Sequence, residues 1–201
     1  MVDIKKEELI AFEKEISELF LDKKIHVPVH LVGGNENQLI RIFKMIKKED
    51  FVLSTHRNHY HALLKGVPKE KLKEIITDGE SMHIYDKSLK FLTSSIVGGV
   101  LPIAVGIALS IKLKKETNRV WVFVGDMASH MGIFHECTEY AGRHNLPIIF
   151  VVENNGFSVD SPTEIVWGDE RFKPRIIRYK YKRIWNHVGP GLDGQKIWVS
   201  F

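Results

Sequence analysis

Two short apolar runs stand out in the second half of the chain, at residues 120–124 and 147–152. Their length, and the absence of alternation with polar residues, are typical of strands buried on both faces of a parallel sheet. Between the two runs, apolar residues recur at helical spacing. The pattern therefore predicts a strand, a turn, a helix and a second strand, within an α/β fold in which helices flank a parallel sheet.

Elsewhere the pattern predicts helices over about residues 4–23, 36–47 and 101–114, and a strand over 51–55. The last of these helices lies in a stretch from Phe91 to Ile111 that has no charged residue and is long enough to cross a bilayer. Gly98, Gly99 and Pro102 interrupt this stretch. We therefore expect a loop and a shorter buried helix there, and no membrane span.

Polar side chains follow both apolar runs. Asp126 comes after the first run, and Glu153, Asn154 and Asn155 come after the second. If the two strands are parallel neighbours, these groups open on the same carboxyl edge of the sheet, where open α/β folds bind ligands. Carboxylate and amide oxygens suit Mg²⁺, which completes its coordination with phosphate oxygens and water. The residues predict a magnesium diphosphate site, although the same residues are also common turn formers.

Charge and cysteine content narrow the class of protein. The 201 residues include 29 basic and 25 acidic ones, giving a net charge of +4, and the two signs are interleaved for most of the chain. This distribution favours a solvated surface over nucleic-acid binding. Cys137 is the only cysteine, which excludes an intramolecular disulfide and favours a reducing, cytoplasmic location. The N-terminal residues predict an amphipathic helix rather than a signal peptide.

The two polar strand ends resemble a known cofactor motif. Gly125-Asp126-Met127 and Asn154-Asn155, with Asn155 29 positions after Asp126, resemble the Gly-Asp-Gly and Asn-Asn motif of thiamine-diphosphate enzymes. The resemblance implies a thiamine-diphosphate-binding fold, with thiamine diphosphate and Mg²⁺ as cofactors. It assigns the metal to Asp126, Asn155 and the main-chain carbonyl of Phe157. It also places Met127 and Ala128 at the diphosphate, with Met127 in the position of a family glycine.

Further segments resemble one family in particular, the alpha subunit of thiamine-dependent 2-oxo-acid dehydrogenases such as the pyruvate and acetoin dehydrogenases. The segments are HLVGGNE at 30–36, THRNH at 55–59 and SMHIYD at 81–86. The resemblance implies that His56 and Arg57 contact the diphosphate, that Val97 backs the aminopyrimidine ring, and that His59 acts near the reacting centre. A zinc site at the nearby histidines is not expected, because no cysteine or carboxylate accompanies them.

The C-terminal residues 175–191 resemble the family's final strand and the loop that follows it. The resemblance implies that Arg183 supports the diphosphate and that His187 acts on the substrate, with Asn186 in place of a family glycine. About 50 residues of the usual α/β unit look missing before this segment. We therefore expect a single domain with an N-terminal helix at 1–25, a core at 26–163 and a shortened C-terminal segment at 164–201.

The resemblance implies an alpha subunit that decarboxylates a small 2-oxo acid and transfers the acyl group. A beta subunit would supply the activating glutamate in an α2β2 assembly, and a lipoyl-bearing acyltransferase would be a further partner. Two alternatives stay open. One is the N-terminal half of a transketolase-like enzyme. The other is a non-catalytic subunit that keeps the fold, which Met127, Asn186 and the shortened C-terminal segment motivate.

Overall fold

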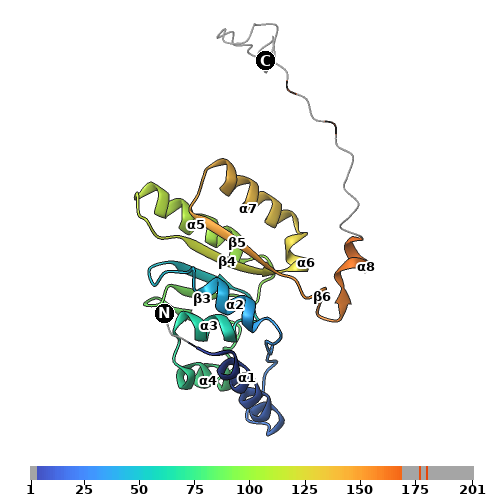
Figure 1. The fold of residues 1–201 in the computed structure, drawn as a ribbon. Coiled ribbons are helices and arrows are strands. Elements are labelled where there is room, and N and C mark those ends of the chain that lie inside the picture. Colours follow the sequence, from blue (N-terminus) through green and yellow to red (C-terminus); the bar gives the residue numbers. More distant parts are fainter. Residues whose placement is uncertain (1–3, 169–176, 178–179, 181–201) are drawn as a thin grey trace, which may run out of the picture. The chain divides into compact units, whose positions relative to one another are not determined.

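A five-stranded sheet forms the centre of the protein, with helices on both of its faces (Figure 1). The computed structural model describes residues 4–168, 177 and 180. Its helices and strands lie in one unit that ends at Gly168. The strand order is β2-β3-β1-β4-β5. The strands are β1 (Phe51–Ser54), β2 (Tyr85–Asp86), β3 (Phe91–Thr93), β4 (Val120–Gly125) and β5 (Ile148–Glu153).

The predicted pairing of the two apolar runs is confirmed. Strands β4 and β5 are parallel neighbours, in a register that runs from Val120 opposite Ile148 to Gly125 opposite Glu153. Strand β1 is also parallel to both β3 and β4, and β2 is antiparallel at the edge. The carboxyl ends of β1, β3, β4 and β5 therefore open on the same side of the sheet.

Helices cover the two faces in separate groups (Figure 1). Within β4, Trp121 and Phe123 pack into a core formed with helices α1 to α4, whereas Val120, Val122 and Val124 pack into a second core formed with α5 and α7. Because neighbouring strand residues point to opposite faces, the continuous apolar run supplies both cores. The helices are α1 (Lys6–Leu21), α2 (Glu36–Phe43), α3 (His59–Lys65), α4 (Lys69–Thr77), α5 (Val100–Leu113) and α7 (Gly132–Arg143).

Most of the helices and strands predicted from the pattern are present, with shifted ends. The predicted helix at 36–47 ends already at Phe43, and the one at 101–114 begins at Val100. Helix α5 has 14 residues, and no helix in the described ranges is long and apolar enough to cross a bilayer. The pattern missed α3, α4, β2 and β3. Such short helices and strands contain too few residues for a helical or strand repeat of apolar positions to be recognised.

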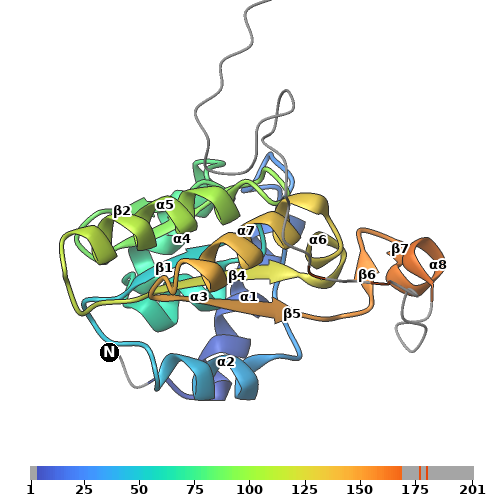
Figure 2. The same ribbon diagram turned by 90° about the horizontal axis from the view of Figure 1, so that it is seen from above.

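A small hairpin and a short helix follow β5. The hairpin is formed by β6 (Phe157–Ser158) and β7 (Ser161–Pro162), and α8 runs from Thr163 to Trp167. Figure 2 shows these elements beside α6 (Asp126–Ser129), at the carboxyl end of β4.

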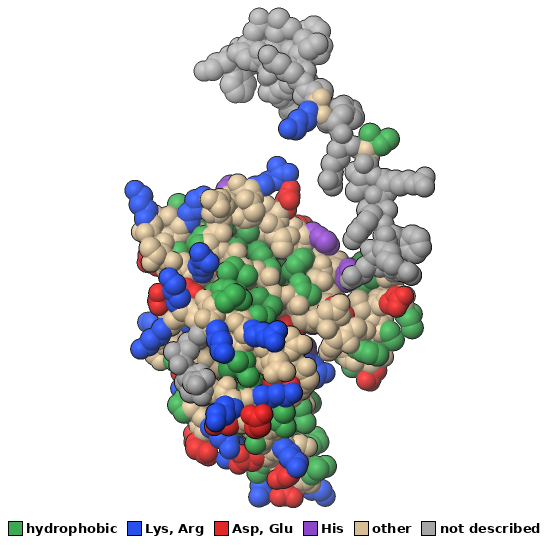
Figure 3. Space-filling view, in the orientation of Figure 1, with side chains coloured by type: hydrophobic (Ala, Val, Ile, Leu, Met, Phe, Trp, Pro, Cys, Tyr) green, Lys and Arg blue, Asp and Glu red, His purple; other side chains and the backbone are tan. Residues whose placement is uncertain are grey.

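The surface charges agree with the interleaved sequence pattern. On the face shown in Figure 3, Lys and Arg side chains are spread over the surface, and Asp and Glu side chains lie among them around α1 and α4. The basic groups are not gathered into one stripe on this face, as they would be in a surface that follows a nucleic-acid backbone.

Candidate functional site

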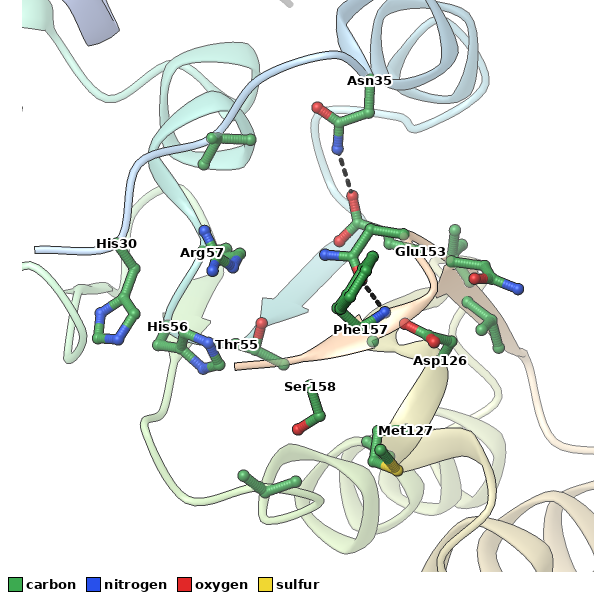
Figure 4. A pocket seen from close by; sticks show the side chains of 18 of the residues that line it. His30, Asn35, Thr55, His56, Arg57, Asp126, Met127, Glu153, Phe157 and Ser158 are labelled. Atoms are coloured by element: carbon green, nitrogen blue, oxygen red, sulfur yellow. Dashed lines mark hydrogen bonds between the residues drawn. The ribbon is translucent and has the colours of Figure 1, made fainter. Parts of the chain in front are cut away.

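A cavity of about 620 Å³ lies at the carboxyl edge of the sheet (Figure 4). Its walls come from the segments that follow β1, β3, β4 and β5, together with the loop at 30–35 before α2. The volume lies within the range of small-molecule sites. The place agrees with the general rule for open α/β sheets, which bind ligands beyond the carboxyl ends of their strands.

Asp126 is a buried carboxylate in the wall of this cavity. It is the first residue of α6, directly after β4, and its exposed fraction is 2%. Its Oδ2 accepts a hydrogen bond from the Thr163 hydroxyl, while its Oδ1 is buried without a hydrogen-bond partner. A buried carboxylate oxygen without a donor costs free energy. The structure thus keeps an unused anionic acceptor beside the cavity.

Asn155 and Phe157 follow β5, at the same edge of the sheet as Asp126. The backbone N–H of Phe157 donates to Asn155 Oδ1 over 2.9 Å, and the backbone N–H of Gly156 donates in the same way to Asn154 Oδ1. These two turns follow β5 and lead the chain into the hairpin. Asn155 and Phe157 both line the cavity, as does Asp126.

A basic and aromatic group lines the cavity after β1. Arg57 donates from Nη1 to the Leu31 carbonyl over 2.8 Å, and the rings of His30 and His56 meet edge to face with centroids 4.6 Å apart. Burial, reinforced by the charges of His30 and Arg57, lowers the pKa of His56 to about 4. His56 is therefore a neutral hydrogen-bonding group at pH 7, and Arg57 carries the positive charge of this group.

Glu153 joins two parts of the cavity wall. Its Oε1 accepts a hydrogen bond from Asn35 Nδ2 over 3.0 Å, which ties the loop before α2 to the end of β5 (Figure 4). Its Oε2 lies 3.2 Å from Nε2 of His61, whose side chain is fully buried. Asn35 and Glu153 are 118 positions apart in the sequence. Their contact is a feature that the sequence did not predict.

Of the site residues expected from the sequence, eight line this one cavity: His56, Arg57, Val97, Asp126, Met127, Ala128, Asn155 and Phe157. Arg183 and His187 lie outside the described residues. Three features of the site were not expected: the Thr163 contact to Asp126, the Asn35 contact to Glu153, and His30 in the wall. The first two join residues far apart in the chain, so no local pattern marks them.

His59 does not line the cavity. Its side chain is fully buried at the start of α3, and its Nδ1 lies 2.8 Å from Oε1 of Glu13, on α1. His59 is therefore not among the residues that line the cavity, and its expected action near the reacting centre stays a prediction. The Glu13 carboxylate pairs with Nδ1 within the core, whereas Nε2 of His59 is buried without a hydrogen-bond partner.

The donor set fits a hard cation. Asp126 offers an unpartnered oxygen, Asn155 a side-chain carbonyl with a second lone pair, and Phe157 a main-chain carbonyl. Oxygen ligands of this kind suit Mg²⁺ rather than Zn²⁺. Among residues 4–168, 177 and 180, no three or more His, Cys, Asp and Glu residues gather in a way that could hold a metal ion. A metal at the cavity would therefore need the mixed oxygen set.

The sequence matches one protein family over most of its length. The family described as Dehydrogenase E1 component matches residues 5–165. The chain belongs to this family. The matched range includes every cavity residue named above, so family membership covers the site as well as the fold.

Relatives from bacteria and plants carry related names. The chain is 33% identical over 200 residues to the alpha subunit of acetoin:2,6-dichlorophenolindophenol oxidoreductase from Bacillus subtilis, covering 94% of this chain and 58% of that subunit. It is 35% identical over 165 residues to a chloroplastic pyruvate dehydrogenase E1 component subunit alpha-3 from Arabidopsis thaliana, covering 74% and 39%. The chain therefore spans about 40–60% of the length of these relatives.

A solved structure from Mycobacterium smegmatis, assigned to the thiamin diphosphate-dependent enzymes, overlaps with a TM-score of 0.39 at 22% identity. The overlap covers 59% of this chain and 20% of the other.

The Bacillus subtilis match contradicts the expected internal deletion. It extends over 200 residues and uses 94% of this chain, which leaves little room for gaps in it. A deletion of about 50 residues, the size of an α/β unit, does not fit inside that match. The assignment of Arg183 and His187 to the family's last loop assumed that deletion. Without the deletion, the assignment of these two residues has no support from the Bacillus subtilis match.

Proposed function

We propose that the cavity binds thiamine diphosphate with Mg²⁺, and that the chain acts as the alpha subunit of a 2-oxo-acid dehydrogenase. The observation that carries the proposal is the unpartnered, buried Oδ1 of Asp126, a residue that lines the same cavity as Asn155, Phe157 and Arg57. An anionic oxygen, two neutral oxygens and a guanidinium around one space suit a metal-bound diphosphate.

The residues of the cavity divide the binding task. Asp126, Asn155 and the Phe157 carbonyl would hold Mg²⁺, and Arg57 would pair with phosphate oxygens. His56, neutral at pH 7 because of its lowered pKa, would donate or accept a single hydrogen bond. Met127 and Ala128 would lie along the diphosphate, and Val97 would pack against a ring. Arg183 and His187 stay predictions, because they fall outside the described residues.

Thiamine diphosphate, held by these residues, would supply the electron-accepting chemistry that the decarboxylation of a 2-oxo acid requires. The cavity residues of this chain would position the cofactor for that chemistry, and an acid-base role of His59 stays a prediction. A beta subunit that provides a glutamate, in an α2β2 assembly, would complete the site. The names of the relatives support pyruvate or acetoin as the substrate. A lipoyl-bearing acyltransferase as a further partner stays a prediction from the family resemblance.

The first alternative was a transketolase-like enzyme, and the family match favours the oxo-acid class over it. A non-catalytic subunit has one observation in its favour. Met127 brings a side chain to the cavity wall, at the position where the motif has glycine.

Thermal melts of the chain with and without thiamine diphosphate plus Mg²⁺ test the proposal. Ligand at about 100 times its Kd should add roughly 2.7 kcal/mol to the free energy of unfolding. Asp126→Asn should abolish this shift and leave the ligand-free melt close to wild type, because it removes an unpaired buried charge. Asp78→Asn, at an exposed helix end, is the matched control and should keep the shift.

A second melt series includes the beta subunit of a related dehydrogenase. If neither the chain alone nor the mixture responds to thiamine diphosphate and Mg²⁺, the proposal is wrong. A response that survives Asp126→Asn would also contradict it, because the metal would then be held elsewhere.

A further inference from the structure

Met127 is held by a contact outside the cavity. Although the residue lines the cavity, its sulfur lies 2.9 Å from Nε1 of Trp167, which donates a hydrogen bond to it. Methionine has three rotatable bonds and adapts its shape readily. Without this contact, the side chain could rotate over the backbone at 126–128. The contact with Trp167 selects one of its positions.

Trp167 is itself fixed from two sides. Its ring stacks on His130, at the end of α6, with centroids 5.2 Å apart and planes within 18°. It also lies at the end of α8, whose first residue Thr163 donates from its hydroxyl to Asp126 Oδ2 and from its backbone to the Gly156 carbonyl over 2.9 Å. Helix α8 is thus attached to α6 at both ends, once through Asp126 and once through Met127 and His130.

We propose that Trp167 is a positioning residue for cofactor binding. It holds the Met127 side chain against α8, and so keeps the backbone at 126–128 open to a diphosphate although residue 127 is not glycine. This inference rests on the proposed function. It assigns a role to α8 and explains how a Met at this position is compatible with a diphosphate site.

A double-mutant cycle tests the coupling between the two side chains. The Kd of thiamine diphosphate with saturating Mg²⁺ is measured by titration calorimetry for wild type, Trp167→Phe, Met127→Gly and the double variant, each as the full chain with the beta subunit of a related dehydrogenase. Trp167→Phe keeps an aromatic ring beside His130 and removes the N–H donor together with the five-membered ring that carries it. It should weaken binding by about 3- to 10-fold, the range expected for one hydrogen bond. In the Met127→Gly background the same change should have no effect.

Ile165→Ala is the control on the same helix, since Ile165 is 81% exposed, and it should bind as wild type does. Circular dichroism melts check that each variant is folded. Binding by wild type with an equal Kd for Trp167→Phe would overturn the role of Trp167 and leave the proposed function intact. An effect of Trp167→Phe that persists with Met127→Gly would also overturn it. If no variant, wild type included, binds the cofactor, the proposed function fails and this inference fails with it.

A second readout needs no cofactor. Trp167→Ala should raise the rate at which peroxide oxidises Met127, followed by mass spectrometry, while Met45, which is 60% exposed and lies after α2, keeps its rate. An unchanged rate at Met127 would show that Trp167 does not restrain this side chain.

Discussion

Asp50 and Asp126 have the same exposed fraction, 2%, and lie at opposite ends of the central strands. Asp50 precedes β1 at the amino edge, and three donors satisfy its carboxylate: the backbone N–H of Lys47 at 3.0 Å, the backbone N–H of Arg119 at 2.8 Å and Trp121 Nε1 at 3.1 Å. Asp126 follows β4 at the carboxyl edge and has one donor, Thr163, with Oδ1 left unpaired.

The difference separates a structural acid from a binding acid. A buried carboxylate that is fully hydrogen-bonded joins parts of the backbone and has no capacity left for a ligand. A buried carboxylate with one free oxygen is less favourable in the isolated chain, and it gains most when a cation arrives. Burial alone would not distinguish the two residues, whereas their hydrogen-bond partners do.

The largest expected effect comes from replacing each acid by alanine. Asp50→Ala leaves one buried and two partly buried donors without an acceptor, so it should lower the free energy of unfolding by about 3–5 kcal/mol. Asp126→Ala should lower it by less than about 1 kcal/mol, because it removes one hydrogen bond together with an unpaired charge. Urea unfolding of the ligand-free chain measures both. Equal losses of unfolding free energy in the two variants would contradict the distinction between a structural and a binding acid. Asp50→Asn keeps one acceptor oxygen, so its loss should lie between those of Asp50→Ala and Asp126→Ala.

A pH titration sharpens the comparison at the amino edge. Lys65 lies behind Asp50 and donates from Nζ to the carbonyls of Lys47, Lys48 and Asp50, and its exposed fraction is 4%. Burial lowers its pKa to about 8, against the opposing charge of Asp50. Above about pH 8, Lys65 in the folded chain releases a proton that it keeps in the unfolded chain until about pH 10.5. The free energy of unfolding should therefore rise with pH between about pH 8 and pH 10.5.

Relative to Lys65→Met, the wild-type free energy of unfolding should therefore rise by about 2 kcal/mol from pH 8 to pH 10 and stay level from pH 6 to pH 7.5. Urea unfolding of both proteins at each pH gives the difference. A difference that falls with pH over the upper window would mean that the carbonyl contacts, rather than burial, control this lysine.

A further small effect concerns the single donor on Asp126. Thr163→Val keeps the shape of the side chain and removes the hydroxyl, so it should lower the free energy of unfolding by about 1 kcal/mol. Thr163→Ser, which retains the hydroxyl, is the control and should lose less. A loss as large as that of Asp50→Ala would show that Asp126 depends on this contact for its structure as much as Asp50 depends on its three donors.

The sequence predicted the part of the site that depends on strand ends. The apolar runs at 120–124 and 147–152 determined which strands are parallel neighbours, and the register from Gly125 to Glu153 then brings Asp126 and Asn155 to one cavity. Such a prediction needs only strand length and polarity. The family resemblance added His56, Arg57 and Val97, which line the same cavity.

Contacts between distant segments could not be predicted in this way. His59 was assigned a place near the reacting centre because of its neighbours in the chain, but Glu13, 46 positions earlier, holds it in the core. Trp167 was given no role, because its partners Met127 and His130 lie in another helix. Local patterns carry no information about which carboxylate or sulfur will meet a given ring.

The outer side of β5 has a consequence for how the molecule behaves at high concentration. Among the described residues β5 is the last strand of its sheet, and its only charged residue is Glu153, at its end. Val152 is 41% exposed. An edge of unpaired backbone groups with apolar, β-branched side chains can template strand addition from another molecule, and natural proteins usually protect such edges with charges or with a covering element. In this chain Pro147, just before the strand, is the one residue near its start that cannot donate to a foreign strand.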